Sequence, residues 1–197
     1  MTDSDRKAEK KRLRMLMKSR RAELPLPEHR EKSFHIMQRL MDLPEWQRSR
    51  TTHIYVSAIN NEVDTLGLLF KMFDAGITVV VPRCDVNPSA LRNVEIRSLD
   101  ELELSRNCLM EPVYSAEREI ATERFDLVVA PVVAFDRTGR RLGMGGGYYD
   151  QLLKRCGCPR IGLAFSFQEH EQVPVEPWDE ALDLIITEQE VIRARRT

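Results

Sequence analysis

The chain alternates between short apolar runs and stretches with helical spacing. Apolar runs rich in β-branched residues predict buried strands at 53–58, 77–82, 125–133, 160–165 and 182–187. Apolar residues three and four positions apart predict amphipathic helices at 5–22, 28–41, 66–75 and 149–155. Strands that alternate with helices are joined by right-handed crossovers, so the pattern predicts an α/β fold with a mainly parallel sheet.

Two regions show this alternation of strands and helices less clearly. Residues 91–99 alternate enough to form a strand or one arm of a hairpin, whereas residues 100–122 are polar, contain Pro112 and are expected to be rich in loops. The chain has no repeat, no low-complexity segment and no interior linker. It is therefore expected to form one domain over residues 1–197, in which residues 1–22 are a basic helical extension.

Composition narrows the class of protein. The 197 residues are 42% hydrophobic and 31% charged, which is typical of a globular chain large enough to form a core without disulfide bonds or a structural metal. No apolar run approaches the roughly 18–20 residues that cross a membrane. The first residues are charged where an export signal needs an apolar segment, and four cysteines do not make a disulfide framework at this length. We therefore expect a cytoplasmic protein with reduced thiols.

Charge is unevenly distributed along the chain. The net charge is −1, yet residues 6–21 carry nine basic residues and one acid, Glu9. Lys10 and Arg14 lie four positions apart and so project from one face of the predicted helix. Charge alone leaves three interpretations open: a solvated helix face, cations that reach a phosphate, or a surface that binds RNA.

The largest cluster of residues suited to ligand binding lies just before the helix predicted at 149–155. Four of the nine glycines fall within residues 143–147, and Arg140 and Arg141 precede them. A strand, a glycine loop and a helix start together offer backbone N–H groups and a positive helix end to an anion. The run has no Walker A lysine, and Tyr148 stands where a dinucleotide-binding motif needs glycine. By itself it indicates either a phosphate site or a structural turn.

Three acids are candidates for ligand binding. Asp150 lies in the first turn of the helix after the glycines, where it is suited to cap that helix or to help hold Mg²⁺. Asp183, near the end of another strand, is a candidate second acid. Glu62 follows the carboxyl end of a predicted strand, where open α/β sheets bind ligands. Position alone does not distinguish Glu62 from an ordinary loop acid.

The run VVAPVVAFDRTGRRLGMGGGYYDQLL resembles the signature of the 5-formyltetrahydrofolate cyclo-ligase (5,10-methenyltetrahydrofolate synthetase) family. Further blocks resemble this family in the family's order, at 10–14, 57–65, 80–83, 173–175 and 183–188. The resemblance implies a three-layer α/β/α sandwich of the sugar-phosphate isomerase/CoA-transferase type, with N-terminal helices. It also implies the ATP- and Mg²⁺-dependent cyclisation of 5-formyltetrahydrofolate to 5,10-methenyltetrahydrofolate, through a phosphorylated formyl oxygen that N10 attacks.

The resemblance also implies roles for individual residues. The residues implied to bind ATP are Lys10, Lys11, Arg12, Leu13, Arg14, Arg141, Leu142, Gly143, Met144, Gly145, Gly146, Gly147, Tyr148 and Tyr149. Those implied to bind the folate are Val56, Ser57, Glu62, Met144, Gly145, Gly146, Gly147 and Tyr148. Arg141 and Asp150 are implied to be catalytic, and Asp150 with Asp183 to hold Mg²⁺.

This chain departs from some relatives at Met144 and Gly146, where those relatives carry basic residues. We expect Arg137 or Arg140 to bind the phosphate in place of those basic side chains. Two rival functions remain: an ATP-dependent enzyme with another formyl or carboxyl acceptor, and a non-catalytic RNA-associated protein that uses the helix at 6–21. We expect a monomer that binds neither nucleic acid nor membrane, and residues 100–122 are a candidate lid over the substrate.

Overall fold

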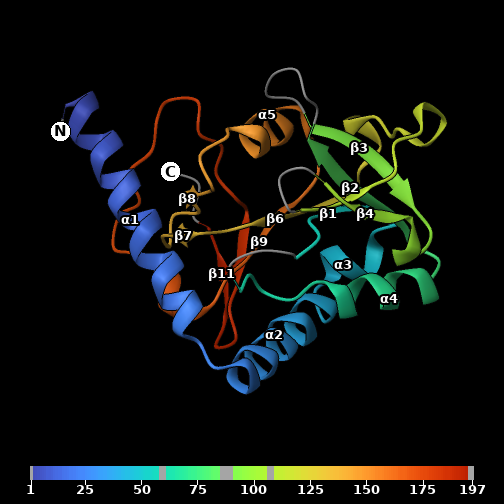
Figure 1. Ribbon diagram of the computed structural model, residues 1–197, viewed down its shortest axis with the longest axis horizontal. Coiled ribbons are helices and arrows are strands. Elements are labelled where there is room, and N and C mark those ends of the chain that lie inside the picture. The colour runs from blue at the N-terminus through green and yellow to red at the C-terminus, as the bar shows by residue number, and fades with distance from the viewer. Residues whose placement is uncertain (1, 58–60, 85–90, 106–108, 195–197) are drawn as a thin grey trace.

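The computed structural model describes residues 2–57, 61–84, 91–105 and 109–194 (Figure 1). Its α-helices are α1 (Asp3–Glu23), α2 (Leu26–Met41), α3 (Pro44–Arg48), α4 (Leu66–Asp74) and α5 (Tyr148–Arg155). The strands of its largest sheet are β1 (Thr51–Ile54), β2 (Thr78–Cys84), β3 (Leu91–Ile96), β6 (Leu127–Pro131), β9 (Arg160–Leu163), β10 (Leu184–Ile186) and β11 (Val191–Arg193). Two small antiparallel pairs accompany this sheet: β4 (Leu102–Leu104) with β5 (Met110–Pro112), and β7 (Ala134–Phe135) with β8 (Arg141–Leu142).

The sheet is mainly parallel, as the sequence predicts. Within the described residues its strand order is β11-β10-β9-β6-β1-β2-β3. The strands from β10 to β2 are parallel, and both edge strands, β3 and β11, run antiparallel to their neighbours. The carboxyl ends of β1, β2 and β6 therefore lie at the same end of the strands, and open α/β sheets bind their ligands at that end.

Helices cover both faces of the sheet, which confirms the predicted three layers. Successive strand residues point to opposite faces, so Val79 and Val81 enter one core and Val80 the other. The first core takes its helical side chains from α2, α3 and α4. The second takes Leu152 and Leu153 from α5. Figure 1 shows α5 on the opposite side of the strands from α2 and α4.

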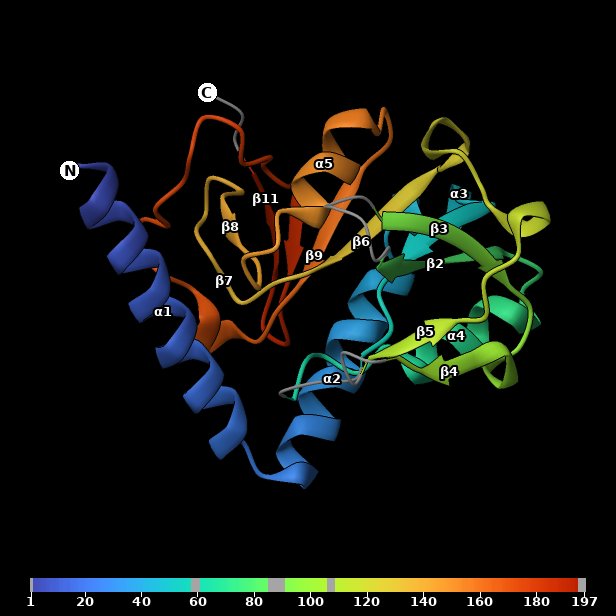
Figure 2. The ribbon, with the colours of Figure 1, turned by 45° about the horizontal axis from the view of Figure 1, so that its top comes forward.

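Helix α1 lies to one side of the sheet and meets α2 in a V (Figure 2). Its inner face packs Leu13 and Met17 against a separate small core that includes Val133 and Leu142, next to the β7–β8 hairpin. Thr2 and Asp5 form a capping box that starts the helix. Because Leu13 is fully buried, its helical neighbours Lys10 and Arg14 also face the body of the protein.

The segment at 100–122, which the sequence predicts to be rich in loops, contains short regular elements among its described residues. These are β4, β5, the 3₁₀ turn Ala116–Arg118 and two 3₁₀ turns that overlap its ends, Leu99–Glu101 and Thr122–Arg124. The sequence does not predict β11 or the β7–β8 hairpin, because two- and three-residue strands carry too few positions to show a period. No helix among the described residues is long and apolar enough to cross a membrane. That residues 1–197 form a single domain stays a prediction.

Candidate active site

A cavity of about 820 Å³ opens at the carboxyl ends of the parallel strands. The strand ends contribute Val56, Pro82 and Pro131, and the glycine loop between β8 and α5 contributes Gly143–Gly147. Helix α1 and the segment that precedes β10 line it as well. Residues from widely separated parts of the chain therefore meet here, as expected for a ligand site in an open α/β sheet.

Backbone geometry explains the glycines of the loop. Gly145 and Gly147 have φ angles of 108° and 71°, which residues with a side chain rarely adopt. A Cβ on Gly146 would lie 2.7 Å from the Tyr148 ring. Gly147 is also the N-cap of α5, and no side chain caps that helix. The N–H groups of the first turn of α5 are therefore left without side-chain partners, a feature of helices that bind anions.

Arg141 and Asp150 flank the loop and are joined by an ion pair. Arg141 Nη1 lies 2.8 Å from Asp150 Oδ1, and the Arg141 side chain is only 3% exposed. The backbone of Glu180 contacts both residues: its carbonyl accepts from Arg141 at 3.2 Å and its N–H donates to Asp150 at 3.1 Å. Arg141 Nε is buried and has no hydrogen-bond partner among the described residues. The guanidinium is thus fixed on one side, and its Nε donor is not satisfied by any described residue.

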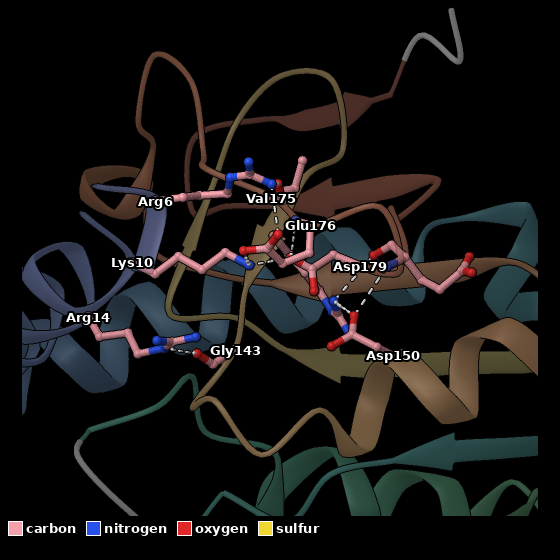
Figure 3. A network of polar contacts seen from close by, with 10 residues as sticks. Arg6, Lys10, Arg14, Gly143, Asp150, Val175, Glu176 and Asp179 are labelled. Atoms are coloured by element: carbon pink, nitrogen blue, oxygen red, sulfur yellow. Dashed lines mark hydrogen bonds and ion pairs between the residues drawn. The ribbon is translucent and has the colours of Figure 1, made fainter. Parts of the chain in front are cut away.

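Helix α1 brings cations to the same cavity (Figure 3). Lys10 Nζ lies 2.6 Å from Asp179 Oδ2 and 3.6 Å from Glu176 Oε1. One turn later, Arg14 Nε donates to the carbonyl oxygen of Gly143 at 2.9 Å. Both cations are therefore anchored to the glycine loop or to the segment before β10, and both line the cavity.

Another part of the cavity wall holds Glu62 with Tyr55 and Tyr149. His29 Nε2 lies 2.7 Å from the carbonyl oxygen of Glu62 and so fixes its backbone. Burial, and then the negative charge of Glu62, raise the pKa of both tyrosines well above the usual value. Their phenol groups therefore remain neutral hydrogen-bond donors beside this carboxylate.

A family model of the 5-formyltetrahydrofolate cyclo-ligase family matches residues 6–188. The chain belongs to this family. An Escherichia coli 5-formyltetrahydrofolate cyclo-ligase is 30% identical over 182 residues, covering 89% of this chain and 98% of the relative. The mouse enzyme is 30% identical over 190 residues, covering 91% and 93%.

Solved structures agree with this assignment. The NMR structure of Aquifex aeolicus 5,10-methenyltetrahydrofolate synthetase matches with a TM-score of 0.83 and 33% identity, covering 95% of this chain and 94% of that one. The cyclo-ligase family converts 5-formyltetrahydrofolate to 5,10-methenyltetrahydrofolate with ATP, and this is the activity of the chain.

Most residues that the cyclo-ligase resemblance implicates do line the cavity: Lys10, Arg14, Val56, Glu62, Arg141, Leu142, Gly143, Met144, Gly145, Gly146, Gly147, Tyr148, Tyr149 and Asp150. Three residues of the first block do not. Lys11 and Arg12 are exposed, Arg12 pairs with Glu9 at 2.7 Å, and Leu13 is buried in the core. A helix turns about 100° per residue, so five consecutive residues cannot all face one ligand.

Ser57 and Asp183 also lie outside the lining of the cavity. Ser57 Oγ donates to Asp64 Oδ1 at 3.2 Å and so belongs to the turn before α4. Asp183 Oδ2 accepts from the backbone N–H of Arg160 at 2.9 Å, where β9 and β10 begin. This is the amino end of β9 and β10, whereas the cavity opens at the carboxyl ends of the parallel strands β1, β2 and β6. The expected pairing of Asp183 with Asp150 is therefore not supported by the geometry.

Neither arginine expected to replace the missing basic residues lines the cavity. Arg137 is exposed and pairs with Glu169 and Glu190 at 2.8 and 2.6 Å. The backbone N–H of Arg140 donates to Asp136. Arg141 and the two cations of α1 line the cavity instead.

Sequence reasoning missed Asp179 and Trp178, which both line the cavity. Asp179 holds Lys10, and the next residue, Glu180, contacts Asp150 through its backbone N–H. The only signal for these residues is an aspartate after Pro-Trp in a connecting segment. Because Asp179 and its partner Lys10 are 169 positions apart, local sequence gives no indication of their contact.

Proposed function

We propose that this protein phosphorylates the formyl oxygen of 5-formyltetrahydrofolate with ATP, so that N10 closes the ring and releases phosphate. The main support for this proposal is that one cavity is lined by cations, by the glycine loop and by Glu62. The two ligands would then meet inside one enclosure, as group transfer between them requires.

ATP is needed because the formyl oxygen leaves the carbon only after it has been phosphorylated. The formyl oxygen attacks the γ-phosphorus, the bond to the bridging oxygen of ADP breaks, and ADP leaves with that electron pair. The N10 lone pair then forms a bond to the formyl carbon. Next the bond from that carbon to the phosphorylated oxygen breaks, phosphate leaves with the electrons, and the proton on N10 passes to water. The sequence of steps requires positioning and charge neutralisation and no protein nucleophile.

Three cations support the binding of ATP phosphates: Lys10, Arg14 and Arg141. Each lines the cavity, and Arg141 retains a buried donor at Nε. Backbone N–H groups of the glycine loop and the start of α5 add a neutral anion site. Together they would neutralise the charge that spreads over the transferred phosphoryl group.

Asp150 and Asp179 suit the Mg²⁺ that accompanies ATP. Both line the cavity, and the Asp179–Glu180 peptide lies against the Asp150 carboxylate. The described residues contain no group of three His, Cys, Asp or Glu side chains able to hold a metal. Mg²⁺ commonly takes one or two carboxylates and completes its shell with phosphate oxygens and water, so this donor set fits. When bound, the ion would neutralise the β- and γ-phosphates.

Glu62 supports the recognition of the pterin. A carboxylate accepts two parallel N–H bonds, which matches the amide-like edge of the pterin ring. Val56, Met144 and Tyr148 also line the cavity and would pack against its faces. Glu62→Gln should raise the KM for the folate by about tenfold or more while the KM for ATP changes by less than about twofold. An unchanged folate KM would favour another formyl or carboxyl acceptor.

An isotope experiment tests the phosphorylated intermediate directly. With ¹⁸O in the formyl group, the mechanism predicts that the released phosphate carries the label. Label found in water and not in phosphate would contradict it. A monomeric state, a cytoplasmic location and closure of residues 100–122 over the substrate stay predictions.

A further inference from the structure

Tyr149 carries a buried hydroxyl group that nothing in the described protein satisfies. It is the second residue of α5, and its Oη is buried without a hydrogen-bond partner although the residue lines the cavity. Leaving a buried hydroxyl unpaired disfavours the folded state, because the group loses its bonds to water. Such a group is retained where a ligand completes it.

The ring of Tyr149 is held in place by its neighbours. His53 packs edge-on against it, with ring centroids 5.7 Å apart at 74°. The His53 ring in turn packs on Phe125, with centroids 5.3 Å apart. Tyr149 also packs against both cores of the sheet. These contacts fix the direction of the hydroxyl without providing it a partner.

The surroundings of Tyr149 indicate which ligand atom it meets. Tyr149 lines the same cavity as Glu62, which would bind the folate, and Arg141, which would bind phosphate. Beyond the effect of burial, Glu62 raises and Arg141 lowers the pKa of the Tyr149 phenol. The hydroxyl is therefore within the influence of groups that would hold each of the two substrates. In the proposed reaction only one atom belongs to both, namely the formyl oxygen, which starts on the folate and ends on phosphate.

We infer that Tyr149 donates a hydrogen bond from its hydroxyl to the formyl oxygen of the bound folate, as a catalytic residue for ring closure. This inference rests on the proposed function. After phosphoryl transfer that oxygen bridges carbon and phosphorus. When the bond between carbon and oxygen breaks, the electron pair stays on the oxygen of the leaving phosphate, and the Tyr149 donor stabilises the charge that develops there. The hydroxyl keeps its own proton throughout.

Tyr149→Phe isolates the hydroxyl, because it removes one oxygen and leaves the packed ring in place. Formation of the methenyl product is followed by its absorbance with saturating ATP and Mg²⁺. The inference predicts a fall in kcat of about tenfold or more, with the KM for ATP within about twofold of wild type. The control is Ser19→Ala, which removes a hydroxyl that donates to Glu23 at 2.9 Å outside the cavity, and whose kinetics should not change.

A second readout separates catalysis from structure. Because the hydroxyl has no partner in the ligand-free protein, Tyr149→Phe should unfold at the same temperature as wild type or higher. In contrast, Tyr55→Phe removes a hydroxyl that donates to the Val63 carbonyl at 2.9 Å, and should unfold at a lower temperature.

Three results with the Tyr149→Phe variant would overturn this inference alone. A Tyr149→Phe variant as active as wild type would remove the catalytic role and leave the proposed function intact. A lower unfolding temperature of ligand-free Tyr149→Phe would assign the hydroxyl a structural role. A selective rise in the KM for ATP would place the hydroxyl on the nucleotide. Absence of product from the wild-type protein would overturn the proposed function together with this inference.

Discussion

Arg141 and Asp150 lie on either side of the glycine loop, yet their side chains meet at 2.8 Å. The ion pair joins the two ends of the loop, and the backbone of Glu180 binds both partners. It leaves one buried donor on Arg141 unpaired among the described residues. The pair therefore helps to set the shape of the loop and at the same time holds a cation beside the cavity.

Arg141→Lys should lower kcat by about a hundredfold, because a lysine supplies neither the planar fork nor the second donor at Nε. Steady-state kinetics with saturating substrates measures this. Arg137→Lys is the matched control, since Arg137 is exposed and pairs outside the cavity. Equal activity of both variants would contradict the role given to Arg141.

The two faces of α1 provide a further test. Arg14→Ala should raise the KM for ATP by about tenfold, because the variant has no charged group to bind the phosphate. Arg12→Ala should leave this KM within about twofold, because Arg12 is exposed and pairs with Glu9 on the same helix. Weaker ATP binding in both variants would mean that the whole basic block acts, as the resemblance implies.

A titration with Mg²⁺ tests whether Asp179 or Asp183 is a metal ligand. Asp150→Asn and Asp179→Asn should each raise the Mg²⁺ concentration for half-maximal activity by about tenfold, since each removes a charged oxygen from the cavity. Asp183→Asn should leave that concentration unchanged, because its carboxylate accepts the Arg160 N–H at the far end of the strands. The reverse order of effects would restore the pairing expected from sequence.

His53 makes stability depend on pH. Complete burial lowers the pKa of its imidazole from 6.5 to about 3. Below pH 6.5 the unfolded chain takes up a proton at this site and the folded protein does not, so the stability present at neutral pH is lost as pH falls. Between pH 7 and 5 the free energy of unfolding should drop by about 2 kcal/mol from this group.

Urea unfolding at several pH values checks this contribution. His53→Phe keeps a ring between Phe125 and Tyr149 and should lose about 2 kcal/mol less than wild type over the same range. Parallel curves for the two proteins would show that His53 is not buried in its neutral form.

Sequence predicts this fold well where a period is long enough to read. The helices at 5–22, 28–41 and 66–75 correspond to α1, α2 and α4, and the predicted crossovers account for the mainly parallel direction of the strands. Short elements such as β7 and β8 are missed, because two residues show no period. They matter nevertheless, since β8 begins with Arg141.

Prediction of the cavity residues fails where a continuous stretch of sequence is assigned to one ligand from the family resemblance. Motifs contain neighbours in sequence, whereas a helix presents only every third or fourth residue to a ligand. That is why Lys10 and Arg14 reach the cavity and Lys11 and Arg12 do not. Asp179 is missed for the opposite reason: its partner Lys10 is 169 positions away, and only the folded chain joins them.

The most direct test of the account is the appearance of 5,10-methenyltetrahydrofolate absorbance when the purified protein receives 5-formyltetrahydrofolate, ATP and Mg²⁺. We predict product in proportion to the phosphate released, no product when ATP is omitted, and a much slower reaction without Mg²⁺. Phosphate release without methenyl absorbance, or absorbance that does not depend on ATP, would contradict the account.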